Sequence, residues 1–263
     1  MWLVLLILIT LGINFCHLSY SNDNEYAVIK LQCYFESFGN DGFGCRTVNL
    51  TSNSRRTFIK SILRLSTTNS KSKSKATNND VNTFYSYNGN ITFIPKQIGE
   101  HFPNLNNFII TKTGLKYIEW RDFKHMGHLE MIKLNENKIE AISQCAFHYL
   151  ENLKSINLDG NRIQILPLKL LTNLPNLTEF SANDNDITHL MTEMFKENQN
   201  LKTLLMNRNK IEVIEIDFHG WNIDRVEFKN NTCINMKYIC CAHVIFKNFT
   251  EHIKKNCGGP DFC

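Results

Sequence analysis

Apolar residues return every 24 positions along most of the chain. The clearest segments are 105–110, 129–134, 153–158, 177–182 and 201–206, and each begins with a leucine. In every segment, positions one, four and six are apolar, so the second half alternates between apolar and outward-facing residues. That alternation has the period of two expected for a β-strand with one buried face. The pattern therefore predicts a row of short strands, one in each 24-residue unit.

Asparagine follows the last four segments at a fixed distance. It lies three residues beyond each segment, and an isoleucine lies two residues further on. The asparagines are Asn137, Asn161, Asn185 and Asn209. An amide side chain both donates and accepts hydrogen bonds, so it can satisfy backbone groups of the next unit. We therefore predict a ladder of asparagines along the stack.

The resulting motif, Leu-x-x-Leu-x-Leu-x-x-Asn-x-Ile, resembles the leucine-rich repeat. That resemblance implies an α/β solenoid, or horseshoe, whose concave side is a parallel sheet. Weaker units beginning at Val81 and Ile223 extend the array to about seven repeats over residues 81–232. One repeat cannot bury its apolar residues alone, so neighbouring repeats must share a continuous core.

The two ends of the chain differ from the repeats. Residues 1–21 contain a short apolar run followed by small residues, as in a secretory signal peptide. This run is shorter than the roughly 20 residues of a membrane-spanning helix. No second apolar stretch of that length follows, so we expect a secreted, extracellular protein without a membrane span. Residues 22–80 are predicted to form an N-terminal cap, and residues 233–263 a cysteine-rich C-terminal cap.

Cysteines cluster at both ends of the array. Those outside the repeats and the leader are Cys33, Cys45, Cys233, Cys240, Cys241, Cys257 and Cys263. Spacing favours the pairs Cys33–Cys45 and Cys233–Cys257, which would close the caps of an exported repeat protein. One of the two adjacent cysteines can pair with Cys263. Cys145, inside a repeat, is interpreted either as a buried thiol or, like the remaining adjacent cysteine, as half of an interchain bond in a disulfide-linked homo- or heterodimer.

Five Asn-x-Ser/Thr sequons support the same compartment. They begin at Asn49, Asn90, Asn176, Asn230 and Asn248. An asparagine-rich chain produces some sequons by chance, so we expect two or three to carry glycans.

Positive charge is concentrated before the repeats. Residues 42–79 contain eight lysines and arginines and no acidic residue, whereas the whole chain carries only +4. Within this stretch, residues 66–79 form a low-complexity loop rich in Ser, Lys and Asn. It is interpreted either as a solvated loop or as a patch for sulfated glycans and other anionic surfaces. Aromatic residues do not interleave with these cations, which argues against nucleic-acid binding.

Catalytic and metal-binding patterns are missing from the sequence. It contains neither G-x-S-x-G nor H-E-x-x-H, and the pair His125 and His128 is expected to lie on the surface. We therefore predict a protein that is not an enzyme and uses no cofactor or metal.

Function is then expected from the concave surface. Outward-facing strand positions three, five and seven supply the candidate ligand-binding residues Tyr85, Tyr87, Ile109, Met131, Lys133, Asn135, Asn157, Asp159, Glu179 and Asn183. Tyr85, Ile109 and Met131 are predicted to form an apolar island where a protein or glycan partner docks.

The cap motifs resemble those of a narrower group. The segment 33–35 (Cys-Tyr-Phe), the segment 44–50 and the pair Cys240–Cys241 are similar to the secreted leucine-rich-repeat proteins of dipteran insects, including the mosquito immune proteins. The resemblance implies innate immune recognition, often as disulfide-linked dimers acting with complement-like thioester proteins. Those proteins continue into a coiled coil, which this sequence lacks after Cys263.

We therefore interpret the chain as a secreted binding module, with a role in innate immunity as the first hypothesis. Two other classes remain open at this point, namely an extracellular matrix or developmental adhesion protein and a secreted inhibitor or salivary effector. The fold that the repeats predict hosts many unrelated activities, so it does not decide among the three.

Overall fold

A computed structural model describes residues 27–37, 43–65, 76–216, 218, 221–239 and 243–258 of the chain. The predicted signal peptide, Cys240, Cys241, Cys263 and residues 66–75 of the basic loop lie outside these described residues.

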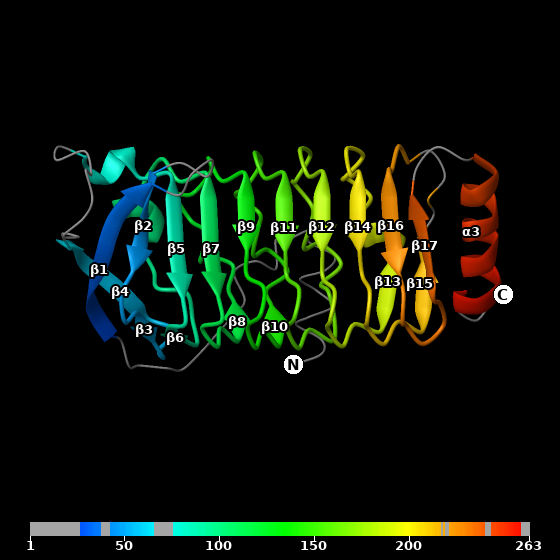
Figure 1. Cartoon of the computed structure of the whole chain (residues 1–263), viewed down its shortest axis with the longest axis horizontal. Helices are drawn as coiled ribbons and strands as arrows, with labels where there is room; N and C mark the ends of the chain where they lie inside the picture. Colours follow the sequence, from blue (N-terminus) through cyan, green and yellow to red (C-terminus); the bar gives the residue numbers. More distant parts are fainter. Residues whose placement is uncertain are drawn as a thin grey trace, which may run out of the picture.

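One sheet of eleven strands runs the length of the molecule (Figure 1). Seven of its strands come from the repeats: β5 (Thr83–Tyr87), β7 (Asn107–Thr111), β9 (Met131–Lys133), β11 (Ser155–Asn157), β12 (Glu179–Ser181), β14 (Thr203–Leu205) and β16 (Arg225–Phe228). Neighbouring repeat strands are parallel and pair in register, so that Ile132, Ile156 and Phe180 lie side by side. The predicted solenoid with about seven repeats is confirmed.

The side opposite this sheet consists mainly of turns and short strands. Three two-stranded parallel sheets join β3 (Thr51–Ser52) to β6 (Asn90–Ile91), β8 (Tyr117–Ile118) to β10 (Ala141–Ile142), and β13 (His189–Met191) to β15 (Val213–Glu215). The helical elements on the coils are the single turns η3 (Asn78–Asp80), α2 (Ile98–His101) and η4 (Thr192–Met194). Helix is therefore scarce in the described repeats.

Leucine, isoleucine and phenylalanine side chains fill the space between the two sides. Phe108 lies 5.2 Å from Phe84 and 5.2 Å from Phe123, measured between ring centroids, and Phe123 lies 5.6 Å from Phe147. All four rings are fully buried. Burying one such side chain stabilises a fold by about 2–3 kcal/mol. Because the rings of successive coils touch, the core is continuous along the stack.

The asparagine ladder forms, and it points to the preceding coil. The Asn161 amide nitrogen donates to Leu134 O (3.1 Å) and Leu158 O (2.8 Å), and its oxygen accepts from Ile139 N (3.0 Å). The sequence analysis predicted that each asparagine bonds to backbone groups of the next coil. In the structure, the partners that lie outside the asparagine's own coil belong to the preceding coil. The amide nitrogens of Asn137, Asn161, Asn185, Asn209 and Asn231 all donate in this way, over 2.7–3.1 Å.

A left-handed residue turns the chain at the end of each repeat strand. Its φ angle is 54° at Lys112, 55° at Glu136, 65° at Gly160 and 52° at Arg208. The turn residues of neighbouring coils lie beside one another, so that Lys112 pairs with Glu136 (3.1 Å) and Arg208 pairs with Asp184.

Three strands of the N-terminal cap join the main sheet. β1 (Ala27–Ser37) pairs antiparallel with β2 (Phe43–Thr47) and parallel with β4 (Thr57–Leu65). Because β2 pairs parallel with β5, a repeat-like coil already begins inside the predicted cap. Cys33 and Cys45 form a disulfide between β1 and β2, with Cα atoms 5.2 Å apart, which is the pair that the spacing favours. The buried Leu31, Phe35 and Ile59 side chains cover the core at this end.

The C-terminal cap combines a strand with a helix. β17 (Met236–Ile239) pairs antiparallel with β16, and α3 (His243–Cys257) covers the last coil. Phe249 of this helix is buried, with its ring centroid 6.1 Å from that of Phe228. A Cys233–Cys257 disulfide holds the helix end.

Cys145 requires a correction to the sequence analysis. One interpretation made it a buried free thiol, but it is disulfide-bonded in the structure. It is only 8% exposed, so the expectation of burial is met. Spacing along the sequence offered Cys145 no partner within the chain, so an interchain bond was the other interpretation.

Replacing Asn161 by alanine tests the ladder. The substitution leaves buried carbonyl and N–H groups of two coils without partners, so we expect the free energy of unfolding to fall by about 2–3 kcal/mol. Urea denaturation followed by circular dichroism measures the change. The control is Asn152→Ala, which removes one exposed hydrogen bond to Gly127 O and should cost less than about 1 kcal/mol. Equal losses in the two variants would contradict the structural role of the buried ladder.

Candidate binding surface

One face of the eleven-stranded sheet, here called the sheet face, carries the candidate residues. Strand pairing aligns a central row across ten strands: Tyr34, Arg46, Tyr85, Ile109, Lys133, Asn157, Ser181, Leu205, Glu227 and Lys237. Met131 and Glu179 belong to the row on one side, and Tyr87 to the row on the other. Register therefore brings the sequence-predicted residues onto a single surface.

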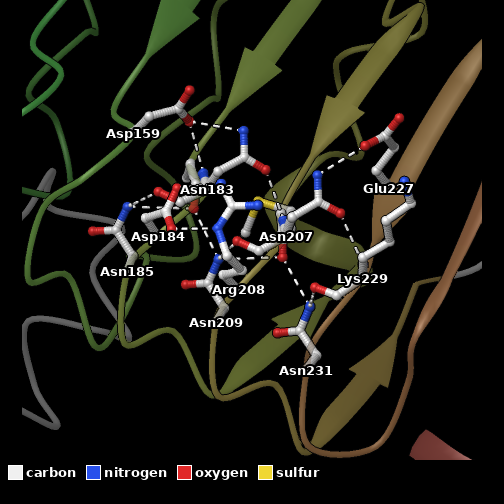
Figure 2. A network of polar contacts seen from close by, with 12 residues as sticks. Asp159, Asn183, Asp184, Asn185, Asn207, Arg208, Asn209, Glu227, Lys229 and Asn231 are labelled. Atoms are coloured by element: carbon white, nitrogen blue, oxygen red, sulfur yellow. Dashed lines mark hydrogen bonds and ion pairs between the residues drawn. The ribbon is translucent and has the colours of Figure 1, made fainter.

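Polar residues in the C-terminal half of this face bond to one another (Figure 2). One Asp159 oxygen accepts hydrogen bonds from Asn183 N (2.7 Å) and from Ser181 Oγ (2.6 Å). The Asn183 side-chain oxygen accepts from Asn207 N (2.8 Å), and that of Asn207 accepts from Lys229 N (2.8 Å). These contacts form a second ladder, on the sheet face. Asp159 and Asn183, predicted to bind a ligand, thus hold neighbouring coils together.

The ladder ends in an ion pair. The Asn207 amide donates to Glu227 Oε2 (2.9 Å), and Arg225 donates to Glu227 Oε1 (2.8 Å). Burial alone would raise the pKa of Glu227, but the hydrogen bonds from Arg225 and Asn207 outweigh it and lower that pKa. Both carboxylate oxygens of Glu227 are therefore occupied within the protein.

The N-terminal half presents aromatic rings instead. Tyr85 and Tyr87 stack with ring centroids 6.4 Å apart and planes at 4°, and the Lys112 ammonium lies 5.6 Å from the Tyr87 centroid. Tyr87 is 45% exposed, and Met131 is half-buried. Ile109 is only 9% exposed, so it supports this surface from below more than it forms it.

Two residues of this surface escaped the sequence analysis. Tyr34 and Arg46 come from the cap strands, and the Arg46 guanidinium lies 4.9 Å from the centre of the Tyr34 ring while pairing with Glu36 (2.5 Å). Arg46 is the register partner of Tyr85. In the structure Cys45 is the register partner of the buried Phe84, so the next residue, Arg46, faces outward, and the sequence alone did not give this register.

Lys133 lies at the centre of the sheet face, between Ile109 and Asn157. It is half-buried and forms no ion pair within the part of the chain that the structure describes. Asn135, two residues after Lys133, donates a hydrogen bond from its side-chain amide to the Glu136 carboxylate (3.3 Å). The N-terminal half therefore combines exposed aromatic surface with an uncompensated positive charge.

All five sequon asparagines are exposed. Asn49 and Asn230 occupy left-handed turns, Asn90 begins β6, and Asn248 lies on α3. Asn176 donates its amide to Glu151 O (2.9 Å). A glycosylated asparagine keeps one amide hydrogen, so this bond is compatible with modification.

A buried ionic cluster lies away from the sheet face. Lys96 Nζ contacts Asp122 Oδ1 (2.5 Å) and Glu119 Oε2 (2.8 Å). Burial raises the pKa of the Asp122 carboxyl to about 6, although Lys96 opposes the rise. Arg55 of the cap approaches Glu119 and lies over the Phe93 ring. Because the cluster joins the cap to the first coils, it is structural in this setting.

No group of three or more His, Cys, Asp or Glu side chains within the described ranges is arranged to hold a metal. His125 and His128 share an open hollow with Glu100, whose carboxylate lies 3.8 Å from His125. None of the helices that the structure describes has the length and apolar character to cross a bilayer.

Comparison with known proteins supports the architecture. The family described as leucine rich repeat matches residues 103–163 and 128–187. The protein has the leucine-rich-repeat fold. A search of curated protein sequences gives no significant match.

Two solved structures share this leucine-rich-repeat fold. The APL1 leucine-rich repeat domain superposes with a TM-score of 0.61 at 15% identity, over 77% of this chain and 48% of that one. Toll, in its complex with Spatzle from Drosophila, gives a TM-score of 0.53 at 22% identity, over 70% of this chain and 24% of that one. The protein spans about half the length of the first structure and a quarter of the second, and at these identities the likeness concerns the fold alone.

Asp122 gives the leucine-rich-repeat protein a measurable pH dependence. Its pKa is about 6 when folded and near the ordinary 3.8 when unfolded, so the folded state binds this proton more tightly. Its contribution to stability is therefore full below pH 4 and is lost as the pH rises through 6. Between pH 7 and pH 4 we expect the wild type to gain on the order of 2 kcal/mol relative to Asp122→Asn. Denaturation at several pH values measures both proteins, and parallel profiles would contradict the assignment.

Proposed function

We propose that this protein is an extracellular, non-enzymatic binding module that docks a protein partner on the N-terminal half of its sheet face. The proposed site comprises Tyr34, Arg46, Tyr85, Tyr87, Ile109, Met131 and Lys133. One contrast carries the proposal: Asp159, Asn183 and Glu227 in the other half bond within the protein, whereas Tyr87 remains exposed.

The residue types suit a protein interface. Tyrosine, methionine and arginine are enriched at such interfaces, and tyrosine and arginine often dominate their binding energy. The stacked Tyr85 and Tyr87 rings are already ordered, so little side-chain entropy is lost on docking. Lys133 adds a positive charge that favours a carboxylate on the partner. Asn135, Asn157 and Glu179 border this surface as polar rim residues.

A role in insect innate immunity is the biological setting that we propose. The fold likeness to APL1 and to Toll, whose complex with Spatzle is described as a hub in development and innate immunity, supports this choice. The disulfide-closed caps and exposed sequons suit a secreted glycoprotein. Expression in the source animal should rise after bacterial challenge, whereas constant expression in cuticle or gland would contradict an immune role.

The docking site is tested by removing its apolar side chains. A partner captured from extracellular fluid is identified and purified, and its Kd is measured by biolayer interferometry. The triple variant Tyr85→Ser, Tyr87→Ser and Met131→Ser should weaken binding by about 100-fold, because losing three interface side chains at about 1 kcal/mol each removes roughly 3 kcal/mol.

A matched variant controls for general loss of apolar surface. Tyr149, Ile165 and Leu168 are 44%, 74% and 48% exposed and lie outside the strands of the main sheet. Replacing these three by serine should leave Kd unchanged. Loss of binding in this control, with full binding in the first variant, would place the interface on the other side of the solenoid.

A further inference from the structure

The outer strands of the N-terminal cap carry an unbalanced positive charge. Residues 27–37 and 43–65 contain six lysines and arginines and one glutamate, so six minus one gives a net +5. Arg46 is paired with Glu36, and Arg55 lies near Glu119. Lys30, Arg56 and Lys60 are exposed and make no ion pair among the residues that the structure covers.

Several lysines of the repeats are compensated from a neighbouring coil. Lys154 pairs with Glu130 (2.9 Å), Lys210 with Asp186 (2.6 Å) and Lys112 with Glu136 (3.1 Å), and each partner lies one coil away. An acidic residue 24 positions along the chain thus compensates each of these lysines. Lys30, Arg56 and Lys60 have no such partner among the described residues, so their charge remains available.

Strand pairing places the cap cations along one ribbon. Lys30 on β1 is the register partner of Ser61, the residue after Lys60, and Ala27 N donates to Arg56 O (3.0 Å) at the start of the same pair of strands. Arg56 and Lys60 lie four residues apart, which is roughly 13 Å along a strand. Arg64 does not continue this row, because the register shifts at Lys30 and Arg64 pairs with the buried Cys33, lies over the Phe35 ring and donates to Ala76 O (2.7 Å). Lys30, Arg56 and Lys60 therefore form a short track beside the first half of β4.

We propose that this track, formed by Lys30, Arg56 and Lys60, binds a sulfated polysaccharide. A linear polyanion matches a linear row of cations, and it supplies anionic groups at repeated intervals along its chain. The exposed Val28 (53%) and Leu63 (48%) lie on the same two strands, but two aliphatic side chains and three cations give only marginal attachment to a bilayer. None of the three cations belongs to the proposed protein-docking site, although Lys30 lies on the same strand as Tyr34.

Chromatography on immobilised heparin tests the proposal with the whole chain at pH 7.4. Wild-type protein should be retained at 0.15 M NaCl, a physiological ionic strength. The variant Lys30→Gln, Arg56→Gln and Lys60→Gln should bind heparin about tenfold more weakly and elute at a lower NaCl concentration, because fewer counterions are released. A matched variant, Lys138→Gln, Lys169→Gln and Lys196→Gln, removes the same charge from exposed positions on the repeats and should elute with the wild type.

Two further measurements complete the test. A charge-preserving variant, Lys30→Arg with Lys60→Arg, should keep full retention, and the melting temperature of every variant reports folding.

Lack of retention of the wild type, or equal shifts in the cap and repeat variants, would overturn the proposal. Cap-dependent flotation with phosphatidylserine vesicles in the absence of heparin retention would also overturn it, in favour of lipid. The Tyr85, Tyr87 and Met131 variant should still bind heparin, so failure of protein docking remains distinguishable from failure of this site.

Discussion

Burial of each coil by its neighbours is the constraint on which the rest of this structure depends. A single 24-residue unit has an apolar face too wide to cover by itself, and Phe108 is enclosed only because Phe84 and Phe123 lie against it. Stacking in turn buries backbone groups at the turn after each strand, where no strand partner reaches them. The asparagine ladder satisfies those groups, so apolar burial and amide bonding recur with one period.

The same constraint shapes both ends of the molecule. The first and last coils each have a neighbour on one side only, and the caps supply the missing cover. At one end a disulfide between β1 and β2 holds strands that extend the sheet, and at the other a disulfide holds α3 over the last coil. Because Lys30, Arg56 and Lys60 of the cap form no ion pair among the described residues, the N-terminal end is basic.

The sheet face divides by how its polar groups are used. In the C-terminal half, Asp159, Asn183 and Asn207 extend a second ladder and leave little hydrogen-bonding capacity for a visitor. In the N-terminal half, the stacked Tyr85 and Tyr87 rings present apolar surface. Lys133, which forms no ion pair with any described residue, adds a charge that attracts carboxylates. This division is the basis for the docking site that we propose at the N-terminal end.

The sequence by itself determined the period, the direction of the strands and the face to which Tyr85, Met131 and Asp159 belong, because a two-residue alternation inside a 24-residue repeat leaves one arrangement that buries the leucines. It also contained the pairing of Cys33 with Cys45, since the two lie close in the chain. Only the tertiary structure decided that Tyr34 and Arg46 align with Tyr85 on the sheet face, that Asp159 and Asn183 are engaged by their neighbours, and that Cys145 is bonded. These outcomes depend on register and distance between segments that no local pattern encodes, and so they emerge when the coils are stacked.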